Sequence, residues 1–374
     1  CFGNGLGFRF TDGKAASLDI SEYWDGLYGG FLLEMAEGAP AVGKVIGQTI
    51  SEYRIETPDG VVDLQQVQDA WQQKLNPVFP WTITPRTEAV KRFSFTASSW
   101  PAPAQKVARP QVLIPVFPGT NCEYDMARAF ERAGAKPEIF VIRNLTSSQI
   151  EDSVAQMAKL IGESQIIAIP GGFSGGDEPD GSGKFITAFF RNPSIKEAVH
   201  TLLGQRDGLM LGICNGFQAL VKLGLIPFGE IRDMDESCPT LTYNKIGRHQ
   251  SMLVRTRIAS NKSPWLMHTK VDDIHTIAIS HGEGRFIASE ELLSTMEANG
   301  QIATQYVDFD GNPTLDIRFN PNTSVHAIEG ATSPDGRVFG KMGHSERYSL
   351  GVFQNVPGDF DQKMFQGAVD YFAK

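Results

Sequence analysis

From residue 111 onward the sequence alternates short β-rich apolar runs with amphipathic segments of helical length. Residues 111–117 predict a buried strand, and residues 121–134 predict a helix because apolar side chains recur there at spacings of three and four. The unit repeats through PEIFVI, a helix at about 148–162 and QIIAIP, and residues 208–213 lead into a helix from Asn215. This alternation predicts an α/β fold, a mostly parallel sheet with helices on both faces. In such sheets reactive groups gather at the carboxyl ends of the strands.

The flanking parts of the chain have a different pattern. Residues 1–100 contain short apolar runs separated by turn signals such as Pro58-Asp59-Gly60, which predict strands and hairpins in a small α+β segment. A stretch rich in proline and alanine at residues 100–104 has the composition of a linker. We therefore predict two domains, 1–100 and 108–374. Hairpin-like segments return after Pro227, and a last helix closes the chain.

Composition narrows the classes of function. With 374 residues, 41% of them hydrophobic, the chain is long enough for two packed domains. Its net charge of -9, with no basic cluster, argues against a nucleic-acid partner or an acidic membrane surface. No apolar run approaches the roughly 20 residues of a membrane-spanning helix. The four cysteines form no CxxC pair and no metal-ligand spacing with histidine, so we expect no metal site and a reducing, cytoplasmic location.

The sharpest local motif is GICNGFQ, in which Cys214 stands between Gly212 and Gly216 at the junction of a predicted strand and helix. This arrangement is typical of a nucleophile elbow, where small neighbours allow a tight turn and the helix N-terminus favours a thiolate. The backbone N–H of Asn215 would then bind an oxyanion. The alternative is a buried, inert cysteine at the end of a strand.

A glycine-rich loop, PGGFSGG, follows the preceding predicted strand. The sheet would bring this loop beside the elbow, where the N–H of Gly172 or Phe173 would supply a second oxyanion donor. The alternative is an ordinary flexible loop. A phosphate-binding loop is disfavoured, because neither GxxxxGK[ST] nor GxGxxG occurs here.

A reactive thiolate also needs an acid and base, and histidine is the side chain that titrates near neutral pH. His281 and His344 each have a glutamate two residues later, Glu283 and Glu346, which extended backbone would place on the same side. Spacing alone does not choose between the two histidines. Cys122 is a rival nucleophile, since it too follows a strand and opens a helix, but it lacks the flanking glycines.

Taken together, the motifs GICNGFQ, PGGFSGGD and GHSER resemble the triad-type (class I) glutamine amidotransferases, which have a flavodoxin-like fold. Within that class, VFPGTNCEYD, SHGEGRF and NPNTSVHAIEGATSPDGRVFG resemble the glutaminase domain of phosphoribosylformylglycinamidine synthase. The resemblance runs from about residue 111 to the C-terminus. More weakly, LYGGFLLEMAEG and KVIGQTISEYRIETPDGVVDL resemble the last part of that enzyme's synthetase portion, so we expect the chain to be a piece of a longer polypeptide.

The resemblance implies roles for individual residues. It implies Cys214 as nucleophile, His344 as acid and base, and Glu346 as the residue that orients the imidazole. It places His281 in a loop lining the site, and it assigns Gln218 and Arg248 to the substrate glutamine. The sequence departs from the family at two positions, since Ser345 replaces the usual proline and Ile246 a serine or threonine.

The implied activity is hydrolysis of glutamine to glutamate and ammonia. The ammonia would serve a synthetase in the same polypeptide that uses ATP and magnesium to convert formylglycinamide ribonucleotide into the amidine, while this chain itself binds no cofactor. Two alternatives are a free-standing cysteine hydrolase or γ-glutamyl peptidase of the same fold, and a non-catalytic interaction module. The intact set of cysteine, histidine and glutamate disfavours the second.

Overall fold

A computed structural model of the chain describes residues 1–10, 28–40, 42–57, 60–84, 86, 88–100, 102–176 and 183–373. Contacts divide the chain into two compact units, Cys1–Trp81 and Thr82–Lys374. Four sequence features fall partly outside the described residues: Leu27 of LYGGFLLEMAEG, Pro58 and Asp59 of the predicted turn, Pro101 of the predicted linker, and Asp177 of PGGFSGGD.

The first unit is a small sheet with one helix among its described residues. Its strand order is β2-β1-β3-β4, with β1 parallel to β3 and the other pairs antiparallel. Strands β3 and β4 form the hairpin expected there, with Thr57 paired to Gly60. The Asp63 side chain caps α3 by accepting the Gln66 N–H at 3.1 Å. The elements are β1 (Gly7–Phe10), β2 (Gly47–Ile50), β3 (Arg54–Thr57), β4 (Gly60–Asp63) and α3 (Leu64–Gln73).

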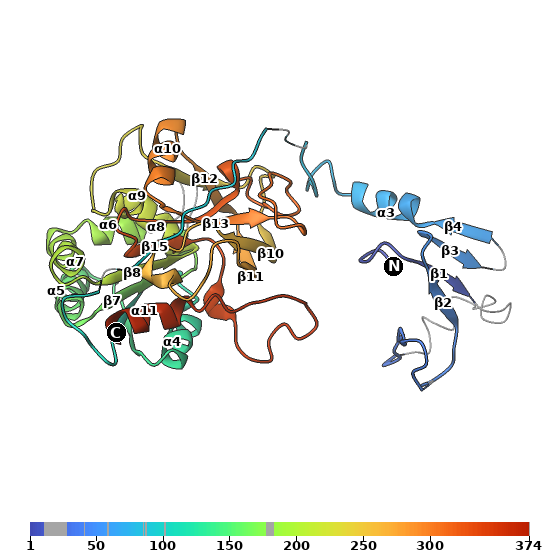
Figure 1. The fold of residues 1–374 in the computed structure, drawn as a ribbon, viewed down its shortest axis with the longest axis horizontal. Coiled ribbons are helices and arrows are strands. Elements are labelled where there is room, and N and C mark those ends of the chain that lie inside the picture. Colours follow the sequence, from blue (N-terminus) through green and yellow to red (C-terminus); the bar gives the residue numbers. More distant parts are fainter. Residues whose placement is uncertain are drawn as a thin grey trace. The chain divides into compact units, whose positions relative to one another are not determined.

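The second unit is built on a nine-stranded sheet of order β11-β10-β13-β14-β15-β8-β7-β5-β6 (Figure 1). One half is parallel: β6 (Lys136–Val141), β5 (Gln111–Val116), β7 (Ile166–Ile169), β8 (Leu209–Ile213) and β15 (Val338–Lys341). The other half is antiparallel: β14 (Ile328–Thr332), β13 (Ile302–Val307), β10 (Gln250–Ile258) and β11 (Ile274–His281). A separate pair joins β9 (Thr240–Tyr243) to β12 (Glu283–Ile287).

Helices pack on the parallel half in the pattern that strand and helix alternation predicts. In Figure 1, α4 and α11 lie on one side of the sheet and α6, α8 and α9 on the other. The α/β fold class is confirmed, and among the described residues no helix is long and apolar enough to cross a bilayer. The helices are α4 (Glu123–Arg132), α5 (Ser147–Glu163), α6 (Lys184–Phe190), α7 (Pro193–Gln205), α8 (Asn215–Leu223), α9 (Leu225–Phe228), α10 (Glu290–Ala298) and α11 (Met364–Ala373).

The central parallel strands are deeply buried. All residues of β7 and β8 are buried, as are residues 112–115 of β5. Strands covered on both faces are expected to read as continuous apolar runs, which these three do. The loops that leave the carboxyl ends of β5, β7, β8 and β15 therefore meet at one edge of the sheet.

The segment before β5 also belongs to the second unit by its contacts. Phe93 is buried in the core and its carbonyl accepts from Arg257 Nη1 at 2.7 Å. Further along, Ala104 donates its N–H to Asp207 Oδ2 at 3.0 Å. The sequence placed residues 88–100 in the first domain, but these contacts tie them to the large sheet.

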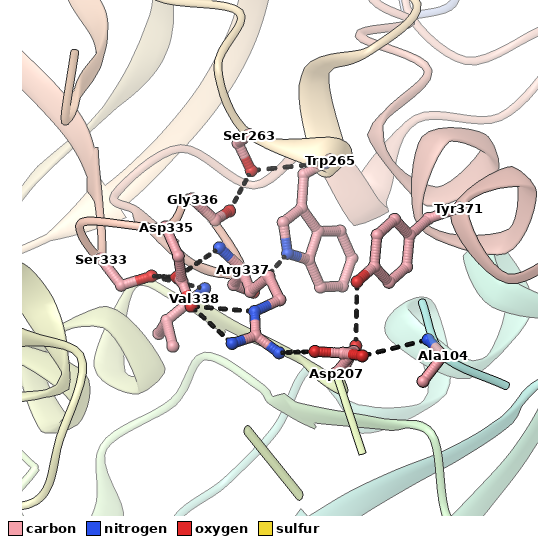
Figure 2. Close-up of polar contacts among 10 residues, drawn as sticks. All are labelled: Ala104, Asp207, Ser263, Trp265, Ser333, Asp335, Gly336, Arg337, Val338 and Tyr371. Carbon is pink, nitrogen blue, oxygen red and sulfur yellow. Dashed lines mark hydrogen bonds and ion pairs between the residues drawn. The ribbon is translucent and has the colours of Figure 1, made fainter. Parts of the chain in front are cut away.

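A polar cluster around Asp207 joins this segment to the amino-terminal ends of β8 and β15 (Figure 2). Asp207 Oδ1 lies 3.0 Å from Arg337 Nη1, and the Asp207 carbonyl accepts from Tyr371 Oη of α11 at 3.1 Å. Trp265 Nε1 donates to the Arg337 carbonyl at 3.1 Å. Asp207 also has φ 51°, a backbone conformation that aspartate tolerates better than most residues.

We predict that Asp207→Ala destabilises the second unit by about 2 kcal/mol, because it removes a charged hydrogen-bond acceptor at a positive-φ position. Asp207→Asn keeps the shape and the backbone tolerance, so it should cost about half as much. Urea denaturation followed by circular dichroism measures both. Asp310→Ala, on an exposed loop, is the control; equal losses in the control and in Asp207→Ala would contradict the assignment.

Candidate active site

Cys214 occupies a strained turn between β8 and α8. Its backbone has φ 53° and ψ -106°, outside the usual regions for a residue with a side chain. A Cβ at Gly212 would come within 2.6 Å of the Gly216 backbone, and a Cβ at Gly216 within 2.1 Å of the Ile169 carbonyl. The two glycines are therefore required by packing, and the thiol, 6% exposed, is held at the N-terminus of α8.

His344 and Glu346 follow β15, the parallel neighbour of β8. The Cys214 N–H donates to the Lys341 carbonyl at 2.8 Å, which continues the pairing of the two strands. His344 Nδ1 lies 2.6 Å from Glu346 Oε1, and both side chains are buried. The pair therefore stands beside the elbow, on the turn that ends in the short helix η4 (Ser345–Arg347).

The imidazole of His344 is poised to carry a proton. Burial lowers its pKa, but the charge of Glu346 and hydrogen bonds with Cys122, Cys214 and Glu346 act in the opposite direction, and the pKa lies well above the usual value. A protonated imidazole beside a thiol favours the thiolate. This electrostatic pairing is the one that thiol nucleophiles require.

Cys122 lies in the same cluster. Its sulfur is 3.9 Å from His344 Nδ1, accepts from Arg347 Nη2 at 3.0 Å and is 3.0 Å from Asn121 Oδ1. Unlike Cys214 it has an unstrained backbone, φ -112° and ψ 13°, and it is only 1% exposed. The sequence motifs offered Cys122 as a rival nucleophile and assigned no role to Arg347.

Cys122, His344 and Glu346 have ligand atoms within 4.8 Å of one another, which is near enough to consider a metal. The 2.6 Å separation of His344 Nδ1 and Glu346 Oε1 is that of a hydrogen bond. Two ligands at about 2.0 Å from a tetrahedral zinc ion would be about 3.3 Å apart. The donor set as it stands therefore fits a hydrogen-bonded pair better than a metal site.

The glycine-rich loop after β7 comes directly against this cluster. A Cβ at Gly171 would lie 2.7 Å from His344 Cε1 and 3.3 Å from both Cys122 Sγ and Cys214 Cβ. Gly172 has φ 144° and forms an isolated bridge with Thr120 in the loop after β5. The two loops thus meet over the two thiols, and only glycine fits at 171.

The predicted oxyanion donors differ in their surroundings. The Phe173 N–H already donates to the Gly119 carbonyl at 2.8 Å, whereas the Gly172 N–H has no hydrogen-bond partner within the described part of the chain. Asn215 lies at the first turn of α8, with its side-chain oxygen 3.3 Å from the Ser174 N–H. Of the two loop candidates, Gly172 is the one whose N–H can serve a ligand without breaking a bond.

The predicted substrate residues are spread around the elbow. Gln218 is buried, and its amide donates to the Glu283 carbonyl at 2.6 Å. Arg248 is half-buried, with Nη1 3.4 Å from the His249 carbonyl. His281 is buried, and its Nδ1 lies 3.2 Å from Asn244 Oδ1, the oxygen of an amide rather than of a carboxylate.

The pKa of His281 is shifted in the direction opposite to that of His344. Burial, together with the charges of His344 and His249, lowers the pKa of His281 to about 3. Its Nε2 is buried without a hydrogen-bond partner among the described residues. A neutral imidazole with an unsatisfied ring nitrogen is suited to contact a ligand, and the structure thereby separates the two histidines that spacing could not.

Comparisons with known proteins agree on the family. The CobB/CobQ-like glutamine amidotransferase domain matches residues 109–372. The PurQ subunit of phosphoribosylformylglycinamidine synthase from Methanococcus maripaludis strain C7 is 34% identical over 246 residues, 64% of this chain and 84% of the relative. The PurQ subunit from Treponema denticola is 35% identical over 251 residues, 64% and 88% of the two chains.

A solved structure shares the fold. A chain of PurLQS from Thermotoga maritima superposes with a TM-score of 0.51 at 24% sequence identity, covering 70% of this chain and 99% of that one. At this level of identity the likeness concerns the fold alone.

We predict that Gly171→Ala lowers the alkylation rate of Cys214 by iodoacetamide at least about tenfold, because the new Cβ must displace His344 or a thiol. Mass spectrometry of the labelled peptides gives the rate at each cysteine. Gly204→Ala is the control, since a Cβ there meets nothing within 4 Å. Unchanged labelling in Gly171→Ala would show that the cluster has more room than these contacts allow.

The raised pKa of His344 makes stability depend on pH. A histidine whose pKa is higher in the folded than in the unfolded state, about 6.5, stabilises the fold below that pH, and the stabilisation is lost as the pH rises through the folded value. We therefore predict that the free energy of unfolding falls above about pH 6.5 and falls less steeply in Glu346→Gln. Urea denaturation at several pH values measures both slopes, and identical slopes would count against the paired charge.

Proposed function

Since the chain belongs to the CobB/CobQ-like glutamine amidotransferases, as the glutamine amidotransferase of a phosphoribosylformylglycinamidine synthase, we propose that it hydrolyses glutamine through a triad of Cys214, His344 and Glu346. The observation that carries the proposal is the strained, glycine-flanked thiol of Cys214 beside an imidazole that is bonded to a buried carboxylate. The products are glutamate and ammonia.

The reaction divides into two steps. The Cys214 thiolate attacks the side-chain carbonyl carbon of glutamine, and the C–N bond breaks as the His344 imidazolium gives its proton to the leaving nitrogen. Neutral His344 then takes a proton from water, whose oxygen attacks the thioester carbon. The C–S bond breaks, glutamate leaves, and Glu346 stabilises His344 whenever the imidazole is protonated.

Cys214 suits the nucleophile's role better than Cys122. The positive φ of Cys214 turns its side chain out of the strand at the start of α8, the geometry of a nucleophile elbow. Cys122 is less exposed, and its sulfur already accepts from Arg347. In this assignment Cys122 and Arg347 are part of the surroundings of the His344 imidazole and do not react with the substrate.

Backbone amides would hold the oxyanion and side chains would hold the substrate. The N–H groups of Gly172 and Asn215 are the proposed oxyanion donors, with Phe173 contributing only if its loop turns away from Gly119. Gln218, Arg248 and the neutral His281 are the proposed contacts to glutamine. Arg248 is suited to the α-carboxylate because a guanidinium can bind both of its oxygens.

The released ammonia would be used by a synthetase partner. The PurQ relatives are named as subunits of phosphoribosylformylglycinamidine synthase. We propose that the partner here is a synthetase portion of the same polypeptide, which binds ATP and magnesium and forms the amidine in purine biosynthesis. The chain's cysteines, free among the described residues, fit a reducing cytoplasm.

We predict that Cys214→Ala abolishes glutaminase activity, because it removes the thiol proposed to form the thioester, whereas Cys122→Ala keeps most of it. Release of glutamate and ammonia by the full chain is the assay. Mass spectrometry after treatment with a glutamine-like electrophile should find the label on Cys214. Equal loss in both variants, or label on Cys122, would refute the elbow assignment, and thioester formation from γ-glutamyl peptides would favour a peptidase.

A further inference from the structure

One fully buried cation lies next to the proposed triad and has no part in the chemistry described above. Lys341 ends β15, three residues before His344, and its side chain has no solvent exposure. Its Nζ donates to Ser345 Oγ at 2.8 Å and to Gln362 Oε1 at 2.9 Å, and it lies 3.7 Å from Glu329 Oε1. A buried ammonium is costly unless paired and hydrogen-bonded, so this site is built to hold a charge.

The residues on either side of His344 in the chain, Gly343 and Ser345, are bonded to Lys341 or to its partner Glu329. Before it, the Gly343 N–H donates to Glu329 Oε1 at 2.7 Å. After it, Ser345 Oγ donates to Gln362 Oε1 at 2.8 Å while accepting from Lys341. The two residues that flank His344 are thus both bonded into one buried network.

The network is fixed from other elements as well. Glu329 belongs to β14, and its second oxygen accepts from Thr304 Oγ1 of β13 at 2.5 Å. A Cβ at Gly343 would come within 2.6 Å of Ile277 Cγ2, so the turn is pressed against β11. The turn has little freedom to move unless the Lys341 network is broken.

We propose that Lys341 is a positioning residue for glutamine hydrolysis: through Ser345 and Glu329 its ammonium holds the turn that carries His344 and Glu346 against Cys214. The inference rests on the proposed function, which it deepens by adding a residue that does not touch substrate. It also gives a physical role to Ser345, at which this chain departs from the family pattern.

The charge of Lys341 should also set the pH range of the site. The charged and titratable groups that face it are Glu329 from β14, Glu346 from η4 and His275 from β11. Burial lowers the pKa of Lys341, and the two carboxylates oppose that effect. A nearby positive charge disfavours protonation of its neighbours, so removing it should raise the pKa of His344.

The first test is Lys341→Met in the full chain, which keeps the length of the side chain and removes the charge. We expect kcat for glutamine to fall at least about tenfold with KM within about twofold, because positioning is lost while the substrate contacts stay. Both limbs of the pH profile should move upward by about half a unit or more. A kcat and a pH profile of Lys341→Met that both equal those of the wild type would overturn the proposal.

A second variant separates tethering from charge. Ser345→Ala leaves Lys341 and Glu329 in place, so kcat should fall about threefold or more while the pH limbs stay. Ser263→Ala is the matched control, a buried serine whose hydroxyl donates to the Gly336 carbonyl away from the site, and it should keep wild-type kcat. Equal kcat in the two serine variants would overturn the tethering role.

Lys341→Met leaves Glu329 unpaired in the interior, and that variant is expected to fold poorly if the charge cannot be neutralised. Lys341→Met with Glu329→Gln removes both charges and serves in its place. The double variant should show the same fall in kcat with KM unchanged. A wild-type kcat in the folded double variant would refute the inference.

A readout without glutamine keeps the two proposals apart. The rate of Cys214 alkylation by iodoacetamide, followed against pH by peptide mass spectrometry, should have its midpoint at higher pH in Lys341→Met. If the wild-type chain does not hydrolyse glutamine but this midpoint shifts, the proposed function fails and the role of Lys341 in the site stands. An unchanged midpoint in the variant would reject the electrostatic part of the inference whatever the glutaminase result.

Discussion

The parallel pairing of β15 with β8 is the interaction on which the rest of the site depends. It continues one residue past the strands, where the Cys214 N–H donates to the Lys341 carbonyl. Residues about 130 positions apart are thereby placed side by side at the carboxyl edge of the sheet. A shift of β15 by one residue relative to β8 would turn the side that carries His344 to the other face of the sheet, because side chains alternate along a strand.

Close packing, and not chemistry alone, explains why glycine is required at several positions around the carboxyl edge of the sheet. Gly212 and Gly216 let α8 approach the sheet, and Gly171 leaves the space that His344 and the two thiols share. The strained backbone of Cys214 is an outlier of the kind that persists where surrounding structure over-determines it. The same close packing that forces the turn also buries the His344 and Glu346 pair, which strengthens its electrostatics.

The site places several ionisable groups in one buried region and gives each a distinct partner. Burial and neighbouring positive charge keep His281 neutral, whereas Glu346 and the thiols raise the proton affinity of His344. Glu329 neutralises Lys341 within the same interior. Groups of one chemical type thus take different protonation states because their neighbours differ, which is how a single site holds both an acid and a neutral contact.

Several features followed from the sequence alone. The alternation of apolar runs and amphipathic segments predicted β5, α4, β6, α5, β7, β8 and the start of α8 to within about two residues, because local hydrophobic period sets these elements. The motifs predicted the family, and the comparisons confirm it. The sequence analysis did not predict α6 (Lys184–Phe190) or α7 (Pro193–Gln205), for which no motif stood out. It also did not predict that residues 88–100 attach to the large sheet.

What only the tertiary structure decided is which distant side chains meet. His281 and His344 have the same spacing to a glutamate in the sequence. The fold bonds His344 to Glu346 and places the Asn244 amide beside His281. It also puts Cys122 beside the imidazole, bonds Arg347 to the Cys122 sulfur, and bonds the buried Lys341 to Ser345. Local period can mark a strand or a turn, but contacts across more than a hundred residues depend on strand order and register, which no local pattern encodes.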